Sequence, residues 1–198
     1  MSSGSVYGPQ PPSLERLSES YAGRASEDDP GQRFGAAKWR AEQRGNAAVV
    51  KGVDFVSARM FAIVGPRLPF DGQFAIGNFL GDARAGRTVD LTGDGTPIRS
   101  WLYAADMAAW CWTLLARGRS GAAYNIGSEE VISLWSAAQR VAQLATPPVP
   151  VTRAIEPTPS AVPSRYVPSI ELARTELGLD VWTSFDEALR RTWDWSAV

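Results

Sequence analysis

Residues 53–65 have the sequence VDFVSARMFAIVG and are followed by Pro66. This run of β-branched, aromatic and aliphatic side chains predicts a buried strand, which the Gly-Pro pair at its end terminates. Upstream, residues 34 to about 43 favour a helix. Residues 9–33 are polar and rich in Pro, Gly and Ser, as is typical of a long surface loop. A helix followed by a buried strand is a building unit of α/β proteins.

The rest of the chain continues this alternation. Helices are expected over residues 72–85, from Asp106 to near Gly118, over 133–145, and in the tail over SIELARTELG and SFDEALRRTWDW. Short strands are expected in TVDL and IRSWLY, around the turn TGDGTP, and in AAYNIG. A Pro-rich connector spans residues 147–163. The sequence therefore indicates an α/β fold.

The composition excludes several classes of function. Of 198 residues, 44% are hydrophobic, which is enough for a sizeable core. Lys and Arg number 20 against 21 Asp and Glu, so no surplus of positive charge favours nucleic acid. Cys111 is the single cysteine, which rules out internal disulfides and multi-Cys metal sites. Without a signal-peptide pattern or a long apolar run, we expect a cytoplasmic protein with no membrane partner.

Histidine is absent, which removes the commonest general base and the commonest metal ligand. Acid/base chemistry would therefore have to come from Tyr, Lys, Asp or Glu. Phe34 and Lys38 lie four residues apart, so a helix would place both on one face.

Six motifs occur in an order and at a spacing that resemble the extended short-chain dehydrogenase/reductase family, the NAD(P)-dependent nucleotide-sugar epimerases and dehydratases. They are SSGSVYG, Phe34-x-x-x-Lys38, RMFAIVGPR, LTGDGTPIRSWLY, AAYNIGS and RYVPSIELARTELGL. The likeness runs from Ser2 to about Trp195. Each motif alone is weak evidence, but their shared order is specific.

The resemblance implies a fold. In that family a Rossmann half with a Gly-rich phosphate loop precedes the Ser-containing strand end. Neither G-x-G-x-x-G nor G-x-x-G-x-x-G follows an expected strand here. We therefore expect the C-terminal two-thirds of such a protein: a partial Rossmann-type parallel sheet, its N-terminal half missing, and a smaller C-terminal α/β substrate-binding domain. Residues 1–66 would be the remnant of the dinucleotide-binding domain, and residues 67–198 a substrate-binding region interleaved with the last sheet strands at about 98–126.

The resemblance also implies roles for individual residues. The family uses a Tyr-x-x-x-Lys pair, in which the Tyr oxygen takes a proton from a sugar hydroxyl and a nearby cation lowers the pKa of that Tyr. A Ser or Thr hydroxyl binds the same sugar oxygen. These positions correspond to Lys38 and Ser3, but the Tyr position holds Phe34, whose ring transfers no proton. NAD or NADP would lie near Ser3, Lys38 and residues 60–63, with Phe61 and Ile63 as cofactor contacts.

Two further positions concern the substrate, which the resemblance implies to be a nucleotide sugar. Ala62 stands where the family often has an Asn that contacts the sugar-nucleotide diphosphate. Arg99 matches an Arg that binds this diphosphate, a role suited to the guanidinium fork. Gly4-Ser5 replaces the acidic residues that 4,6-dehydratases and decarboxylases carry after the small hydroxyl residue. This disfavours those two chemistries and leaves epimerase or reductase ancestry.

Each assignment has a structural alternative. Ser3 would be a disordered terminal residue, Lys38 an exposed helix charge, Phe34 plain packing, and Arg99 a surface partner of Asp94 or Asp106. Tyr21 or Tyr7 could replace the missing phenol. The aromatic series Trp101, Tyr103, Trp110 and Trp112 is expected in the core, Tyr124-Asn125 in a structural role, and residues 27–29 in a solvated loop.

Two hypotheses about function follow. The first is an NAD(P)-dependent nucleotide-sugar epimerase/dehydratase, impaired by Phe34 and by the absence of the Gly-rich loop. The second is a non-catalytic pseudoenzyme or truncated remnant that binds a sugar nucleotide or a partner chain. A homo-oligomer, or a partner chain covering the missing half, would protect apolar surface left exposed.

Overall fold

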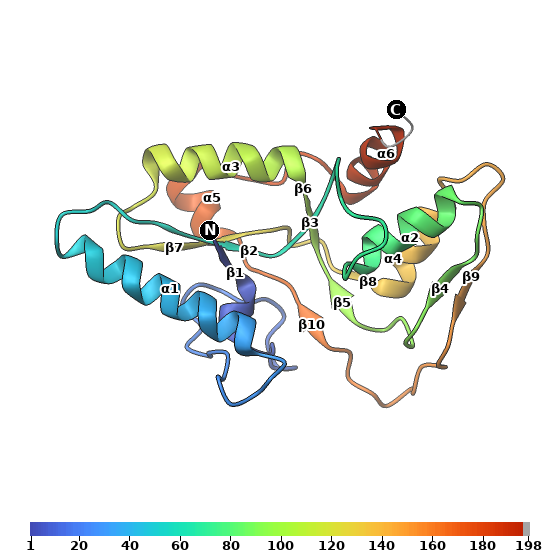
Figure 1. The fold of residues 1–198 in the computed structure, drawn as a ribbon, viewed down its shortest axis with the longest axis horizontal. Coiled ribbons are helices and arrows are strands. Elements are labelled where there is room, and N and C mark those ends of the chain that lie inside the picture. The colour runs from blue at the N-terminus through green and yellow to red at the C-terminus, as the bar shows by residue number, and fades with distance from the viewer. Residues whose placement is uncertain (196–198) are drawn as a thin grey trace.

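The structure, a computed structural model, describes residues 1–195. Its central sheet has the order β1 (Ser2–Ser3), β2 (Ser57–Met60) and β7 (Ala123–Ile126), with all strands parallel. Helix α1 (Arg33–Val49) covers one face of this sheet, and α3 (Ala104–Arg117) with α5 (Glu171–Leu177) covers the other (Figure 1). The protein is therefore α/β, as the alternating pattern predicts.

The run at 53–65 forms two strands where the sequence predicts one. After β2 the chain leaves the central sheet at Phe61, whose N–H donates to the Ile126 carbonyl at 2.9 Å. Strand β3 (Ala62–Val64) then pairs in parallel with β6 (Trp101–Tyr103). The sequence pattern could not show this break, because both strands are at least partly buried and no turn residue separates them.

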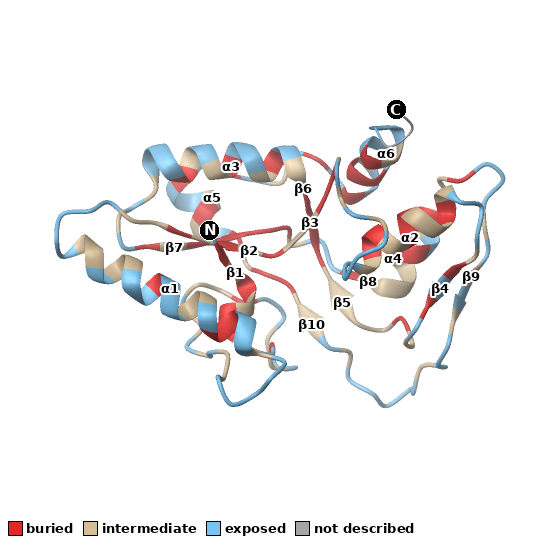
Figure 2. Cartoon of the chain, viewed as in Figure 1, coloured by how far each residue is buried: buried red, intermediate tan, exposed pale blue. Residues whose placement is uncertain are grey.

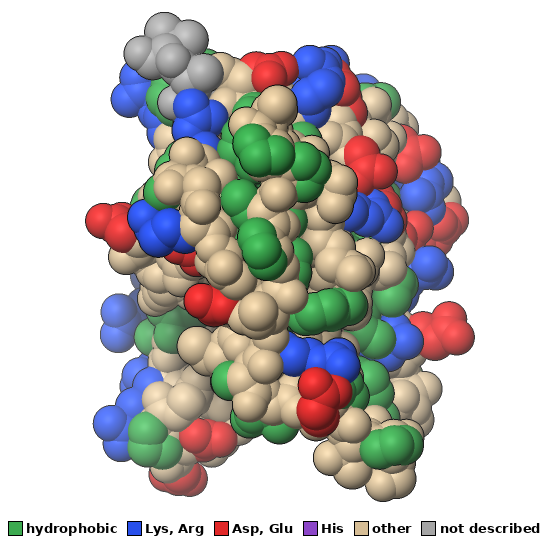
Figure 3. Space-filling view, turned by 90° about the vertical axis from the view of Figure 1, so that its right-hand side faces the viewer, with side chains coloured by type: hydrophobic (Ala, Val, Ile, Leu, Met, Phe, Trp, Pro, Cys, Tyr) green, Lys and Arg blue, Asp and Glu red, His purple; other side chains and the backbone are tan. Residues whose placement is uncertain are grey.

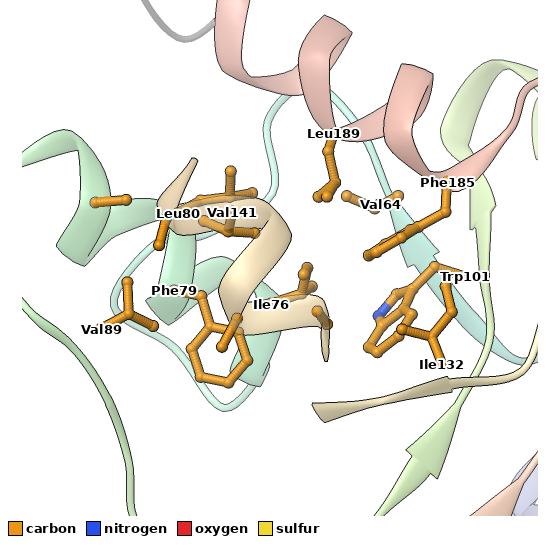
Figure 4. Close-up of a cluster of buried hydrophobic side chains, with 14 of the residues drawn as sticks. Val64, Ile76, Phe79, Leu80, Val89, Trp101, Ile132, Val141, Phe185 and Leu189 are labelled. Carbon is orange, nitrogen blue, oxygen red and sulfur yellow. The ribbon is translucent and has the colours of Figure 1, made fainter. Parts of the chain in front are cut away.

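A second core lies beside the central sheet, between α2 (Ala75–Arg84), α4 (Leu134–Ala142) and α6 (Phe185–Trp195). Strands β4 (Val89–Leu91) and β9 (Val151–Arg153) pair in parallel at its outer edge. Its side chains interdigitate across these elements, with the Trp101 and Phe185 rings stacked at 5.0 Å (Figure 4). Seen from outside, this end of the molecule carries hydrophobic side chains along its middle and charged ones mainly towards its margins (Figure 3).

A small sheet of two-residue strands lies between the two cores. In it β5 (Ile98–Arg99) pairs in parallel with β10 (Arg165–Tyr166) and antiparallel with β8 (Ile132–Ser133). The register places Tyr166 opposite Arg99. One short 3-10 helix, η1 (Gly4–Tyr7), follows β1 directly.

Three sequence-based expectations need correction. Helix α1 extends to Val49, beyond the predicted end near 43. The Pro-rich connector at 147–163 contains β9, which pairs with β4. The loop at 9–33 is anchored in the interior, since Leu17 is fully buried and hydrogen-bonds the backbone of Val167 and Ser169. The last two depend on long-range pairing that a local pattern does not encode.

Most of the aromatic series is buried as expected, but Trp112 is not. Trp101, Tyr103 and Trp110 are core residues, whereas Trp112 on α3 is 72% exposed. The strands of the central sheet are buried, and the outer faces of α1 and α3 are largely exposed (Figure 2). Within residues 1–195, no helix combines the length and the apolar character needed to cross a membrane.

Candidate functional site

All seven residues assigned from the sequence line one cavity of about 820 Å³. They come from four separate parts of the chain: Ser3, Phe34 with Lys38, Phe61 to Ile63, and Arg99. Ser3 ends β1 and Phe61 directly follows β2, so the cavity lies at the carboxyl ends of two neighbouring parallel strands. This edge is where parallel α/β sheets bind their ligands.

Phe34 and Lys38 lie one turn apart on α1, as the spacing predicts. The Lys38 Nζ lies 5.6 Å from the centroid of the Phe34 ring and donates to the Met1 carbonyl at 3.4 Å. Phe34 is 62% exposed, so the packing alternative for this residue is wrong. A ring on the wall of a cavity contacts whatever occupies it. Phe34 nevertheless supplies no oxygen to that wall.

Ser3 belongs to a cluster of three hydroxyl groups. The Ser3 and Ser5 Oγ atoms are 2.9 Å apart, and the Ser5 N–H donates to Ser3 Oγ at 3.2 Å. The Tyr166 hydroxyl forms side-chain hydrogen bonds with both serines. Burial raises the pKa of Tyr166, while these hydrogen bonds and the charge of Arg99 act to lower it. Ser3 is therefore held in a strand and a hydrogen-bonded cluster, which excludes the disordered-terminus alternative.

Tyr166 is a cavity residue to which sequence reasoning gave no role. It lines the cavity and packs on Phe61, with ring centroids 4.5 Å apart. The motif RYVPSIELARTELGL contains it, but only the β10–β5 register shows that it faces the same space as Arg99. Such two-residue strands carry too little periodicity to be predicted.

Arg99 has no acidic partner among residues 1–195. Its Nη1 donates to the Ile98 carbonyl at 2.8 Å and to the Ser164 carbonyl at 3.4 Å. Asp94 instead accepts hydrogen bonds from Thr96, and Asp106 from Trp182 and Thr183, so the proposed surface pairs of Arg99 are wrong. Burial lowers the pKa of Arg99, an effect that Tyr166 opposes. A partly buried guanidinium without a carboxylate is suited to binding an anion.

The cavity as a whole is electropositive. Lys38, Arg67 and Arg99 line it, whereas none of its lining residues within the described chain is Asp or Glu. Because like charges at close range are unfavourable unless an opposite charge compensates, such a wall favours an anionic occupant.

A buried polar network lies behind the cavity. Glu42 accepts from Ser2 Oγ at 2.5 Å and pairs with Arg59 through Nε and Nη2 at 3.0 and 2.8 Å. Arg59 also donates to the Tyr7 hydroxyl at 2.8 Å, and Tyr7 donates to Asn125 Oδ1 at 2.8 Å. This network joins β1, α1, β2 and β7. It confirms a structural role for Asn125.

Neither Tyr7 nor Tyr21 can replace the phenol missing at position 34. Both line a separate, smaller cavity of about 260 Å³ and are not among the residues around the larger one. Burial raises the pKa of Tyr7 to about 12, although Arg59 acts to lower it. The Tyr7 hydroxyl is therefore kept neutral at ordinary pH. In residues 1–195 no group of His, Cys, Asp and Glu side chains is arranged to hold a metal ion.

Known proteins are similar to this chain over more than half of its length. UDP-glucuronic acid decarboxylase 6 of Arabidopsis thaliana is 29% identical over 138 residues, which are 70% of this chain and 39% of the relative. The dTDP-glucose 4,6-dehydratase of Escherichia coli is 26% identical over 120 residues, 58% of this chain and 33% of the relative. The match thus spans about 40% or less of these relatives' length.

Solved structures show the same fold. Pal from Bacillus thuringiensis superimposes with a TM-score of 0.83 at 20% identity, covering 100% of this chain and 61% of Pal. The UDP-glucose 4-epimerase of Thermotoga maritima, solved with UDP-glucose, gives a TM-score of 0.83 at 20% identity over 99% of this chain and 62% of the epimerase. The family model for NAD dependent epimerase/dehydratase proteins matches residues 1–127. With its parallel sheet and its cavity at the strand ends, the chain belongs to the NAD dependent epimerase/dehydratase family.

Proposed function

We propose that the cavity binds a nucleoside-diphosphate sugar, with Arg99 on the diphosphate and Ser3 on a sugar hydroxyl. The observation that carries this proposal is a cavity of about 820 Å³ lined by Lys38, Arg67 and Arg99 and by no carboxylate of the described chain. A diphosphate supplies the missing negative charge, and the cluster of Ser3 and Tyr166 hydroxyls suits the hydroxyls of a sugar. The volume lies within the range of small-molecule sites.

The relatives support this assignment. The Thermotoga maritima epimerase was solved with UDP-glucose, and other structures with the same fold contain NAD or NADPH. On this basis we assign residues 1–66 to the cofactor side of the site and residues 67–198 to the substrate side, interleaved with the sheet strands at about 98–126.

The residues present fit one end of NAD or NADP. Ser3, Lys38, Phe61 and Ile63 share one cavity wall, where Lys38 could donate to ribose hydroxyls and Phe61 could pack on a flat ring. The other end is a pyrophosphate, which a Gly-rich turn between strand and helix normally holds. None of the strand-to-helix connections in this sequence has that pattern. The chain alone therefore fits the nicotinamide end only, and when bound that ring would exchange a hydride with the sugar.

Proton transfer is the catalytic step for which this chain lacks the expected side chain. Positioned acid/base catalysis contributes on the order of 10²- to 10⁴-fold, and Phe34 cannot supply it. Lys38 still provides the cation that would favour an ionised neighbour, but α1 offers it no phenol. We therefore propose that the chain retains nucleotide-sugar binding and that its turnover is impaired. The wholly non-catalytic alternative differs only in having no residual turnover.

Calorimetric titration of the purified chain with UDP and with UDP-glucose tests the proposal. Both ligands should bind, and Arg99→Gln should weaken both by about tenfold or more, because it removes a charge-assisted contact to phosphate. Arg44→Gln is the matched control, since Arg44 is an exposed arginine of α1 outside the cavity. NAD⁺ should show no saturable binding below millimolar concentration. Failure of the wild-type chain to bind either UDP compound would refute the proposal.

A second function, association with another polypeptide, is favoured by the outer face of α3. Trp112 and Leu115 are 72% and 78% exposed, and Ala105, Ala108 and Ala109 beside them are exposed as well. Their spacing forms one continuous apolar stripe. Strand β1 is also an edge of the central sheet and so offers unpaired backbone groups. We propose that a partner chain or a second copy of this chain covers the apolar stripe of α3.

A further inference from the structure

The segment that follows β3 contains an unusual turn at the rim of the cavity. The Leu68 N–H donates to the Gly65 carbonyl at 3.2 Å, so residues 65–68 form a β-turn with Pro66 at its second position. Arg67, at the third position, has a φ of 68°. Within residues 1–195 it is the only residue other than glycine with a positive φ. This is the geometry of a type II turn, whose third position favours Gly or Asn.

The backbone of Arg67 is therefore strained. A side chain with a Cβ atom is disfavoured in the left-handed region, and a bulky one is rarely found there. Glycine would adopt the same conformation without this strain. Non-glycine residues held in such conformations cluster at functional sites, so the strain calls for an explanation in what the side chain does.

The Arg67 side chain has a function available to it, because it lines the electropositive cavity. Its guanidinium lies 5.8 Å from the centroid of the Trp195 ring on α6. No ion pair joins it to a carboxylate among the described residues. Stacking on an aromatic ring orients a guanidinium without neutralising its charge. The Arg67 guanidinium therefore lies at the rim of the cavity as a cation without a carboxylate partner among the described residues.

We propose that Arg67 is a ligand-binding residue that contacts the phosphate groups of the nucleotide sugar, and that the strained turn is retained to place it there. The inference rests on the proposed function and deepens it. Ala62, on the same wall, offers a methyl group where the family resemblance implies an amide contact to the diphosphate. Arg67 supplies a charged donor to the same cavity just beyond the other end of the short strand β3.

Arg67→Gly separates a binding role from a structural one, because the two roles predict opposite changes in stability. If Arg67 is there for binding, glycine relieves the strain, and the unfolding temperature stays the same or rises by up to about 3 °C. At the same time the affinity for UDP should fall about tenfold, with a weaker dependence on NaCl concentration. Arg67→Asn keeps a residue that tolerates the turn and should behave alike. Arg44→Gln is the control for loss of a positive charge elsewhere.

Unfolding is followed by circular dichroism, and UDP binding by calorimetry at two salt concentrations. Weaker UDP binding without loss of stability supports the inference. Unchanged UDP affinity in Arg67→Gly, while Arg99→Gln weakens it, overturns the inference and leaves the proposed function intact. A lower unfolding temperature in both Arg67 variants overturns it by showing that the side chain is structural. Absence of UDP binding by the wild-type chain overturns both.

Discussion

Removal of the Glu42 carboxylate should destabilise the protein far more than removal of an exposed one. The Glu42 side chain is 3% exposed and is the charged partner of Arg59, which is 8% exposed. Truncating one member of a buried pair leaves the other charge uncompensated, at a cost of about 3–5 kcal/mol. For a chain of this size, that corresponds to a fall of roughly 6–20 °C in the unfolding temperature. We therefore expect Glu42→Ala to lower stability by this amount.

Urea denaturation, followed by tryptophan fluorescence, measures the free energy of unfolding. Glu27→Ala is the matched control: its partner Arg40 lies at 3.1 Å, but both side chains are more than half exposed, so the loss should be below about 1 kcal/mol. The double variant Glu42→Leu with Arg59→Met should recover much of the loss, because it removes both charges. A cost for Glu42→Ala no larger than that of the control would refute the reasoning.

Three further predictions concern titration and association. Because the pKa of Tyr7 is raised to about 12 in the folded protein, its contribution to stability is complete below pH 10 and is lost between pH 10 and 12, by roughly 1.4 kcal/mol per pH unit. Tyr7→Phe should make the slope of alkaline urea titrations shallower by this amount, while Tyr124 and Tyr166, whose pKa values burial also raises, keep their own contributions. A slope unchanged by Tyr7→Phe would contradict the assignment. The phenol introduced by Phe34→Tyr should titrate below an ordinary tyrosine, because the Lys38 ammonium lies 5.6 Å from the ring centre and favours the ionised form. Near-ultraviolet absorbance measures this pKa, and adding Lys38→Met must abolish the shift. Trp112→Glu should leave the unfolding temperature within about 2 °C but abolish self-association in analytical ultracentrifugation, and a monomeric wild-type chain would exclude the second copy as the occupant of α3.

The fold is predictable where local pattern suffices. The helices now seen at α2 to α6 follow from apolar periodicity and from terminators such as Gly118 and Gly178, each within a few residues of its expected limits. The side of a helix that is buried is harder to predict when both sides are apolar. Trp110 and Trp112 illustrate this, because they are two residues apart on α3, one fully buried and the other exposed. Only the placement of the sheet decides between them.

The candidate site is predictable to the extent that it follows linear motifs. Ser3, Lys38 and Arg99 were assigned from motif positions, and the structure brings them to one cavity, although their roles stay predictions. Tyr166 and Arg67 could not be found in the same way. The place of Tyr166 depends on the pairing of β10 with β5, and that of Arg67 on a positive φ angle that an arginine disfavours.

The absence of a side chain at position 4 limits what this site can become. A Cβ added to Gly4 would lie 2.6 Å from the Phe61 ring and 2.7 Å from the Tyr166 hydroxyl oxygen. The acidic residue that the resemblance implies at this position in dehydratases and decarboxylases would therefore have to displace the Phe61 ring and the Tyr166 hydroxyl. A side chain at position 4 would have to be accommodated by two residues that are distant in the sequence, at positions 61 and 166. The closeness of these two aromatic side chains therefore makes position 4 selective for glycine.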